Sequence, residues 1–183
     1  VLSHYDNATL YNDSIVAEIV KRFQKEDAVI IYVPDHGEEC YEENRGFICR
    51  NHSANIDWKL AHYEFEIPFW IYCSKKYIQK HRAIYRQIRA AKDKRMMTDA
   101  LPHLLLYLAG IETPTYKEEN NILSPKYNEM RPRILKNSAN YDKLRDEYLK
   151  TQAKQEEKKQ DKKKDKKKDK KQGKKQTKKG ARK

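Results

Sequence analysis

Several features that would assign this chain to a familiar class are absent from its 183 residues. No run approaches the roughly 18 apolar residues that a transmembrane helix needs. The N-terminus has no basic region followed by the short apolar core of a signal peptide. The cysteines Cys40, Cys49 and Cys73 lack the CxxC spacing of a structural zinc site. We therefore expect a chain without a membrane span of its own, in which Cys40 and Cys49 can form a disulfide if the compartment is oxidising, leaving Cys73 free.

The chain also lacks an even distribution of charge. The formal net charge is +13, but residues 151–183 contain 17 Lys/Arg and 5 Asp/Glu, which gives +12, and residues 1–150 contain 23 and 22, which gives +1. The KKKDKKKDKK run of the tail has no apolar residues to bury, so it cannot offset the entropy of ordering. We predict a folded part over residues 1–150 and a disordered Lys-rich tail over residues 151–183. The first part shows no basic stripe with interleaved aromatic residues, so we expect nucleic acid only as a nonspecific ligand of the tail.

The pattern of apolar residues predicts an α/β fold for the first part. A three- and four-residue spacing predicts a helix from Asp6 to about Lys25, with Asp6 or Asn7 as its cap. The run AVIIYV at 28–33 predicts a strand buried on both faces, as in a parallel sheet, and IPFWIYC at 67–73 predicts a second strand. Between them, residues 36–64 read as a long loop.

The remaining predicted elements are mostly helical. We expect a basic-faced helix over 77–94. A further helix should be capped by Thr98, bury four leucines, Leu101, Leu104, Leu105 and Leu108, and end at Gly110. A short edge strand near 131–135 and a weak helix over 141–150 complete the prediction.

The sharpest motif is Pro34-Asp35-His36-Gly37-Glu38-Glu39, directly after the first strand. Open α/β sheets bind ligands at the carboxyl ends of their strands. A carboxylate oxygen and an imidazole nitrogen are both zinc ligands, and Gly37 lets the backbone turn away. On position alone the same triplet also fits a plain turn with a surface histidine. The acidic residues that follow, Glu38, Glu39, Glu42 and Glu43, either orient a metal ligand or bind an ammonium group, or form a solvated loop.

Five segments resemble the C-terminal end of phosphoethanolamine transferases of the alkaline phosphatase/sulfatase superfamily. They are HYDNATLYND, VIIYVPDHGEE, EIPFWIYCS, TDALPHLLLYLAGI and NILSPKYNEMRPRIL, in the family's order and over roughly residues 4–136. The resemblance implies the C-terminal part of a sulfatase-like sheet with covering helices. It implies that Asp35 and His36 are ligands of Zn²⁺ or another divalent metal, and that His52 contacts the transferred phosphate. The sequence around His52 departs from the family pattern, so His62 or Arg50 are alternatives.

The same resemblance implies an activity and its partners. We expect metal-dependent transfer of phosphoethanolamine from a phospholipid donor to a lipopolysaccharide acceptor, lipid A or core, through a threonine-linked intermediate. The complete protein would be held in the inner membrane by an N-terminal anchor, with a periplasmic catalytic domain. Alternatives are a sulfatase or phosphodiesterase of the same superfamily, and a non-catalytic polyanion-binding protein that acts through its tail.

Neither the threonine nor the remaining metal ligands can be assigned in this chain. Because the chain begins at Val1 rather than Met, we expect it to be a piece of a longer protein. We predict that the chain alone is poorly stable and inactive, because its sheet edges and apolar helix faces would need the rest of the domain.

Overall fold

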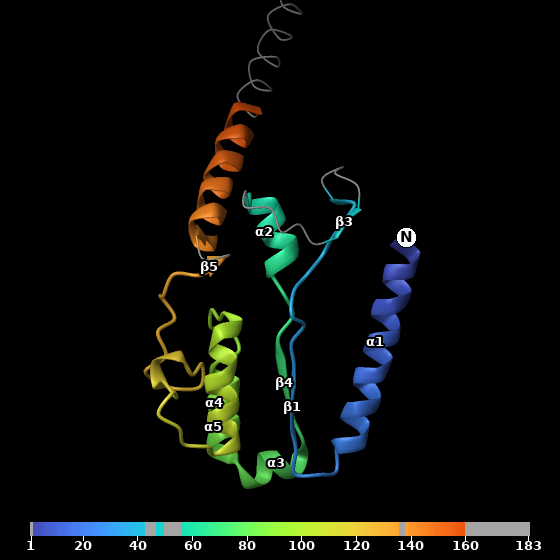
Figure 1. Ribbon diagram of the computed structural model, residues 1–183, viewed down its shortest axis with the longest axis vertical. Helices are drawn as coiled ribbons and strands as arrows, with labels where there is room; N and C mark the ends of the chain where they lie inside the picture. Colours follow the sequence, from blue (N-terminus) through green and yellow to red (C-terminus); the bar gives the residue numbers. More distant parts are fainter. Residues whose placement is uncertain (1, 43–46, 50–55, 136–137, 160–183) are drawn as a thin grey trace, which may run out of the picture. The chain divides into compact units, whose positions relative to one another are not determined.

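The computed structural model describes residues 2–42, 47–49, 56–135 and 138–159 (Figure 1). The chain divides into two units, Val1–Arg133 and Ile134–Lys183. Within the described residues, no helix combines the length and the apolar character that crossing a membrane requires. The predicted end of the folded part at residue 150 stays a prediction.

Helix α1 (Leu2–Phe23) confirms the first predicted helix and begins earlier than expected. Leu2 and Tyr5 extend the apolar stripe by one turn, so Asp6 and Asn7 lie inside the helix and the predicted cap is wrong. The helix has no buried residue. Its exposed apolar side chains include Leu10 at 66% and Tyr11 at 69% exposure.

The two predicted strands pair with each other. Strand β1 (Val29–Tyr32) lies antiparallel to β4 (Trp70–Cys73), with Ile30 opposite Tyr72. All residues of both strands are half-buried, so the predicted burial on both faces is wrong. An apolar run indicates burial but does not give the direction of the neighbouring strand. Here the chain turns back between β1 and β4, so the two strands are antiparallel.

The predicted long loop over residues 36–64 contains regular structure. Strand β2 (Glu39–Cys40) pairs with β3 (Phe47–Cys49), and helix α2 (Trp58–Phe65) follows. Asp57 caps α2 by accepting a hydrogen bond from the Leu60 backbone amide at 2.8 Å. Leu60 and Ala61 are buried, so this short helix is held by tertiary packing that its polar sequence did not reveal.

The predicted basic-faced helix is two helices. Helix α3 (Lys75–Lys80) ends at His81, whose backbone angles are not helical, and α4 (Arg82–Ala90) follows. At the junction His81 Nε2 lies 3.5 Å from Asp27 Oδ1, and its ring lies 4.4 Å from the Tyr77 ring centroid. These tertiary contacts coincide with the interruption that residue spacing did not show.

The last helix of the first unit carries the centre of the core. Thr98 lies in a 3₁₀ turn, η2 (Thr98–Ala100), and makes no capping bond, so the predicted cap is wrong. Helix α5 (Leu101–Ala109) ends at Gly110 with φ 65°, as expected. Leu104 is fully buried but Leu105 is 47% exposed, so only part of the predicted leucine face is core.

The buried cluster around Leu104 joins helices to the strand pair. It contains Ala91, Leu104, Ile122 and Leu123, and half-buried side chains from β1, β4, α4 and α5 pack against it, including Ile31, Ile71, Ile84 and Ile88. The 3₁₀ turn η3 (Glu118–Asn120) precedes Ile122. The apolar faces of α4 and the strand pair therefore share one core.

The second unit is small. Strands β5 (Ile134–Leu135) and β6 (Ala139–Asn140) pair antiparallel, which confirms the predicted short strand. The following helix covers residues 141–159 and so extends nine residues beyond its predicted end at 150. Ala, Gln, Glu and Lys over 151–159 are strong helix formers, and propensity here outweighs the lack of apolar residues. The rest of the predicted tail lies outside the described residues.

Candidate metal centre

Asp35 and His36 follow β1 after two residues, Val33 and Pro34. The Asp35 side chain is 86% exposed and the His36 side chain 25%. Asp35 Oδ1 accepts a hydrogen bond from the His36 backbone amide at 3.1 Å, which turns the carboxylate toward its neighbour. Asp35 Oδ2 then lies 3.4 Å from His36 Nε2.

The hydrogen bond made by the other ring nitrogen of His36 fixes the tautomer of the ring. His36 Nδ1 lies 2.9 Å from the Gly37 carbonyl oxygen. A carbonyl oxygen only accepts, so Nδ1 carries the proton and, in the neutral ring, Nε2 presents a lone pair. This Nδ1–H to carbonyl bond is the usual orienting contact of a metal-binding histidine.

The facing pair fits a bound cation. A neutral imidazole nitrogen and a carboxylate oxygen both present lone pairs, so their approach is favourable only with a proton or a cation between them. Two ligands at zinc–ligand distances of about 2.0–2.1 Å and a tetrahedral angle lie about 3.3 Å apart. The 3.4 Å separation of Asp35 Oδ2 and His36 Nε2 is compatible with both atoms binding one zinc ion.

Gly37 ties the motif to helix α2. Its backbone amide donates to the Glu64 carbonyl oxygen at 2.8 Å. A Cβ at this position would lie 2.2 Å from the Tyr63 carbonyl oxygen. A side chain is therefore excluded by close backbone approach rather than by a left-handed φ.

The acidic residues beside the motif are not uniformly solvated. Glu39 is fully buried, and the Glu42 carboxylate accepts a hydrogen bond from the Cys40 backbone amide. Burial raises the pKa of the Tyr5 phenol on α1, and the nearby Cys40 and Glu38 raise this pKa further. The N-terminal turn of α1 therefore lies close to the acidic segment.

Of the candidates for the phosphate contact, the structure describes His62. His52 and its alternative Arg50 lie outside the described residues, as does Glu43. His62 Nδ1 lies 2.8 Å from Glu66 Oε2 one turn along α2, and its ring stacks on Trp58. Among described side chains no group of three or more His, Cys, Asp or Glu gathers as a metal site. The structure records both Cys40 and Cys73 as thiols that belong to no disulfide. The predicted disulfide of Cys40 with Cys49 is therefore wrong, and the prediction for Cys73 is confirmed.

Comparison with known proteins gives the family. The family model described as Sulfatase matches residues 1–111, more than half of the chain. The chain belongs to the sulfatase family. Its α/β fold, with the motif after the first strand, is the one that the resemblance in the sequence implied.

The relatives point to one branch of this family. Phosphoethanolamine transferase EptC of Escherichia coli is 31% identical over 127 residues, which cover 68% of this chain and 21% of the relative. Kdo(2)-lipid A phosphoethanolamine 7''-transferase of the same species is 28% identical over 43% of this chain and 13% of the relative. The chain thus spans about a fifth of the length of EptC.

Solved structures agree with the sequence relatives. The crystal structure of the C-terminal periplasmic domain of E. coli EptC matches with a TM-score of 0.59, and its complex with Zn with a TM-score of 0.56. Both are 27% identical and cover 75% of this chain but 39% of the solved domain.

Proposed function

We propose that the chain is the C-terminal part of the catalytic domain of a phosphoethanolamine transferase. The reaction moves phosphoethanolamine from a phospholipid donor to lipid A or the lipopolysaccharide core, through a threonine-linked intermediate. The names of the relatives support this branch over a sulfatase or phosphodiesterase. The location we propose for the complete protein is the inner membrane, with this domain in the periplasm.

The facing lone pairs of Asp35 and His36 carry the proposal. Both residues would hold zinc, and bound zinc would supply the Lewis acid that polarises the phosphoryl group. The Gly37 carbonyl keeps the His36 proton on Nδ1 and so leaves Nε2 as a ligand. A solved relative in complex with Zn supports zinc as the metal. His52 remains our proposal for the group that contacts the phosphate.

Zinc titration of the purified, untagged chain tests the metal site. We expect zinc to bind weakly at this position, because Asp35 and His36 supply two of the four ligands of a tetrahedral site. Asp35→Asn and His36→Ala should each weaken it by about 10- to 100-fold or more, since even residues outside the ligand set have effects of that size. His62→Ala removes a histidine engaged with Glu66 and should leave this binding unchanged. Tight stoichiometric zinc binding by the chain alone would contradict the incomplete site.

A chimera tests the activity. In a strain that lacks EptC, this chain would replace the matched part of E. coli EptC, and mass spectrometry of the lipopolysaccharide would measure added phosphoethanolamine. We expect transfer by the parent chimera and by His62→Ala, and none by Asp35→Asn or His36→Ala. Undiminished transfer by the His36→Ala chimera would show that His36 is not a ligand. The isolated chain should show no transfer.

A further inference from the structure

A stripe of arginines on α4 is a strongly charged surface of the first unit that the proposed metal centre does not use. Residues 75–92 contain seven Lys/Arg and no Asp/Glu. Arg82, Arg86 and Arg89 are all exposed, and their spacing of four and three residues places them on one face of the helix. None of the three forms an ion pair or side-chain hydrogen bond with the described part of the chain.

The opposite face of the same helix fixes the stripe in place. Ile84, Ile88 and the following Ala91 pack into the core cluster around Leu104. Gln87 accepts a hydrogen bond from the Tyr107 hydroxyl at 2.8 Å. The arginines therefore project from a helix that is held against α5, and their like charges repel each other along the helix at some cost to its stability. Without a partner this arrangement is unfavourable.

We propose that the arginine stripe of α4, Arg82, Arg86 and Arg89, docks on an anionic lipid surface. Three guanidinium groups on a convex helix, separated by small residues such as Ala83 and Ala90, match the charge of a surface dense in phosphate groups. Tyr85, the aromatic residue of α4, is half-buried rather than exposed, which disfavours stacking of a nucleic-acid strand along the stripe. The choice of a lipid rests on the proposed function, because its donor and acceptor are carried by membranes.

Vesicle binding by the full chain tests this surface. The probes are vesicles of phosphatidylcholine, with and without phosphatidylglycerol. The variant Arg82→Gln, Arg86→Gln, Arg89→Gln should bind the anionic vesicles about 100-fold more weakly, the loss expected when three cations leave an anionic surface. The variant Arg82→Lys, Arg86→Lys, Arg89→Lys keeps the charge and should bind like the parent. Neither change touches a buried side chain, so the circular dichroism spectrum and thermal unfolding should stay the same.

The Lys-rich tail requires a matched control, because it carries most of the net charge. The variant Lys174→Gln, Lys175→Gln, Lys178→Gln removes the same charge, and we expect it to lose at least tenfold less affinity than the Gln variant of α4. An equal or larger loss in the tail variant, or none in the α4 variant, would overturn the proposal. The proposal would also be overturned if the Gln variant of α4 lost as much affinity for a duplex oligonucleotide as for the anionic vesicles, since the stripe would then bind any polyanion. His36→Ala should not change vesicle binding. Failure of the proposed transferase function would therefore be distinguishable from failure of the lipid-docking proposal.

Discussion

Asp35 and His36 show how two adjacent side chains can be set against each other by local backbone contacts. The Asp35 carboxylate is turned by the His36 amide, and the His36 ring is turned by the Gly37 carbonyl. Each contact lies within one residue along the chain, so the pair can form before the distant ligands of the site are present. Because the two residues are adjacent, the sequence could predict them as a pair of ligands. The 3.4 Å separation of Asp35 Oδ2 and His36 Nε2 needed the structure.

Replacing Gly37 by alanine should displace the metal motif from α2. The added Cβ meets the Tyr63 backbone, which cannot move as a flexible side chain would. We expect the free energy of unfolding to fall by about 1–3 kcal/mol, the usual range for forcing extra volume into a packed site, with weaker zinc binding.

Gly110→Ala is the matched control for this change. Its φ of 65° makes alanine unfavourable by about 1–2 kcal/mol, but nothing lies within 4 Å of the new Cβ. Urea titrations should show destabilisation of both variants, and only Gly37→Ala should lose zinc affinity. Unchanged zinc binding in Gly37→Ala would mean that the motif does not depend on its contact with α2.

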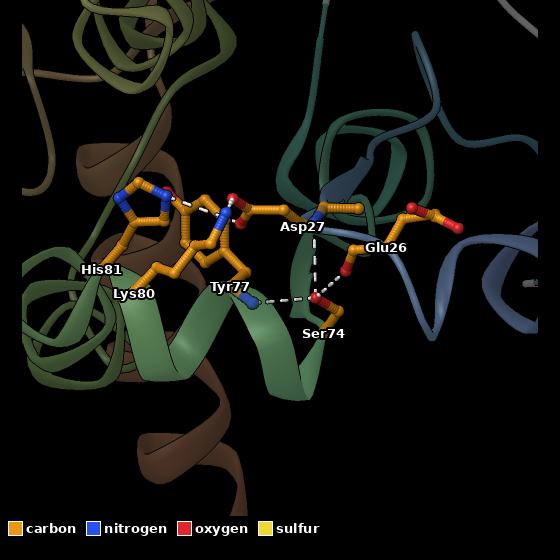
Figure 2. Close-up of polar contacts among 7 residues, drawn as sticks. Glu26, Asp27, Ser74, Tyr77, Lys80 and His81 are labelled. Atoms are coloured by element: carbon orange, nitrogen blue, oxygen red, sulfur yellow. Dashed lines mark hydrogen bonds and ion pairs between the residues drawn. The ribbon is translucent and has the colours of Figure 1, made fainter.

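At the scale of elements, Ser74 connects the strand pair to α3 (Figure 2). Its hydroxyl donates to the Glu26 carbonyl at 2.6 Å and accepts from the Ala28 amide at 3.3 Å and the Tyr77 amide at 3.0 Å. This fully buried side chain thus caps α3 and satisfies the backbone at the start of β1. It lies at the end of the strand pair opposite the metal motif, and its backbone contacts assign it a structural role.

Ser74→Ala should destabilise the first unit. The change removes a helix cap and leaves buried backbone groups without their partner, at a combined cost of about 1–3 kcal/mol. Ser14→Ala removes an exposed hydroxyl that donates to the Leu10 carbonyl one turn earlier in α1, and should be nearly neutral. Urea denaturation monitored by tryptophan fluorescence measures both. Similar midpoints for the two variants would contradict the role of Ser74.

Asp27 adds a pH-dependent contact at the same junction. A hydrogen bond from Lys80, at 2.8 Å, and the charges of Lys80 and His81 lower the pKa of Asp27 below its ordinary value of 3.8. A lowered pKa in the folded state contributes stability above the ordinary value, and this contribution is lost as the pH falls through the lowered one. The stability difference between the parent and Asp27→Asn should therefore be constant near neutral pH and disappear in acid. Chemical denaturation at several pH values measures it, and a difference that grows in acid would contradict this sign.

At the scale of the whole molecule, the first unit leaves apolar and backbone surface without cover in the described chain. The Ser74 amide donates to the Ala28 carbonyl at 3.0 Å, so Ala28 faces β4. The backbone groups of Val29 and Ile31 face the other way by the alternation of an antiparallel ladder, and no third strand is described. Helix α1 has no buried residue either. Such edges and faces favour association.

The isolated chain should therefore self-associate through α1. Replacing both Ile15 and Ile19 by lysine should weaken association about 100-fold or more, because burying each isoleucine contributes about 1.5–3 kcal/mol. Ser3→Lys with Asn7→Lys adds the same charge at polar positions and should have a smaller effect. Sedimentation velocity over a range of concentrations measures this. A monomeric parent with cooperative unfolding would show that these surfaces need no cover.

The sequence by itself determined the elements that depend on local patterns. The spacing of apolar residues located α1, β1, β4 and α5, because an element that buries one face repeats its apolar residues at a regular interval along the chain. The Asp35-His36-Gly37 motif marked the metal centre that we propose, because its two proposed ligands are adjacent in the chain. The separation of charge between residues 1–150 and the tail was equally visible.

Only the tertiary structure decided the pairing and the breaks. The antiparallel order of β1 and β4, the division at His81 and the burial of α2 depend on contacts between residues far apart in the chain, such as Asp27 with His81. The sequence predicted the basic face that carries the arginine stripe, but it did not show whether acidic side chains pair with that face. Acidic residues elsewhere balance its charge in a net charge of +1 over residues 1–150, and only the fold shows that no acidic side chain of the described chain forms an ion pair with it.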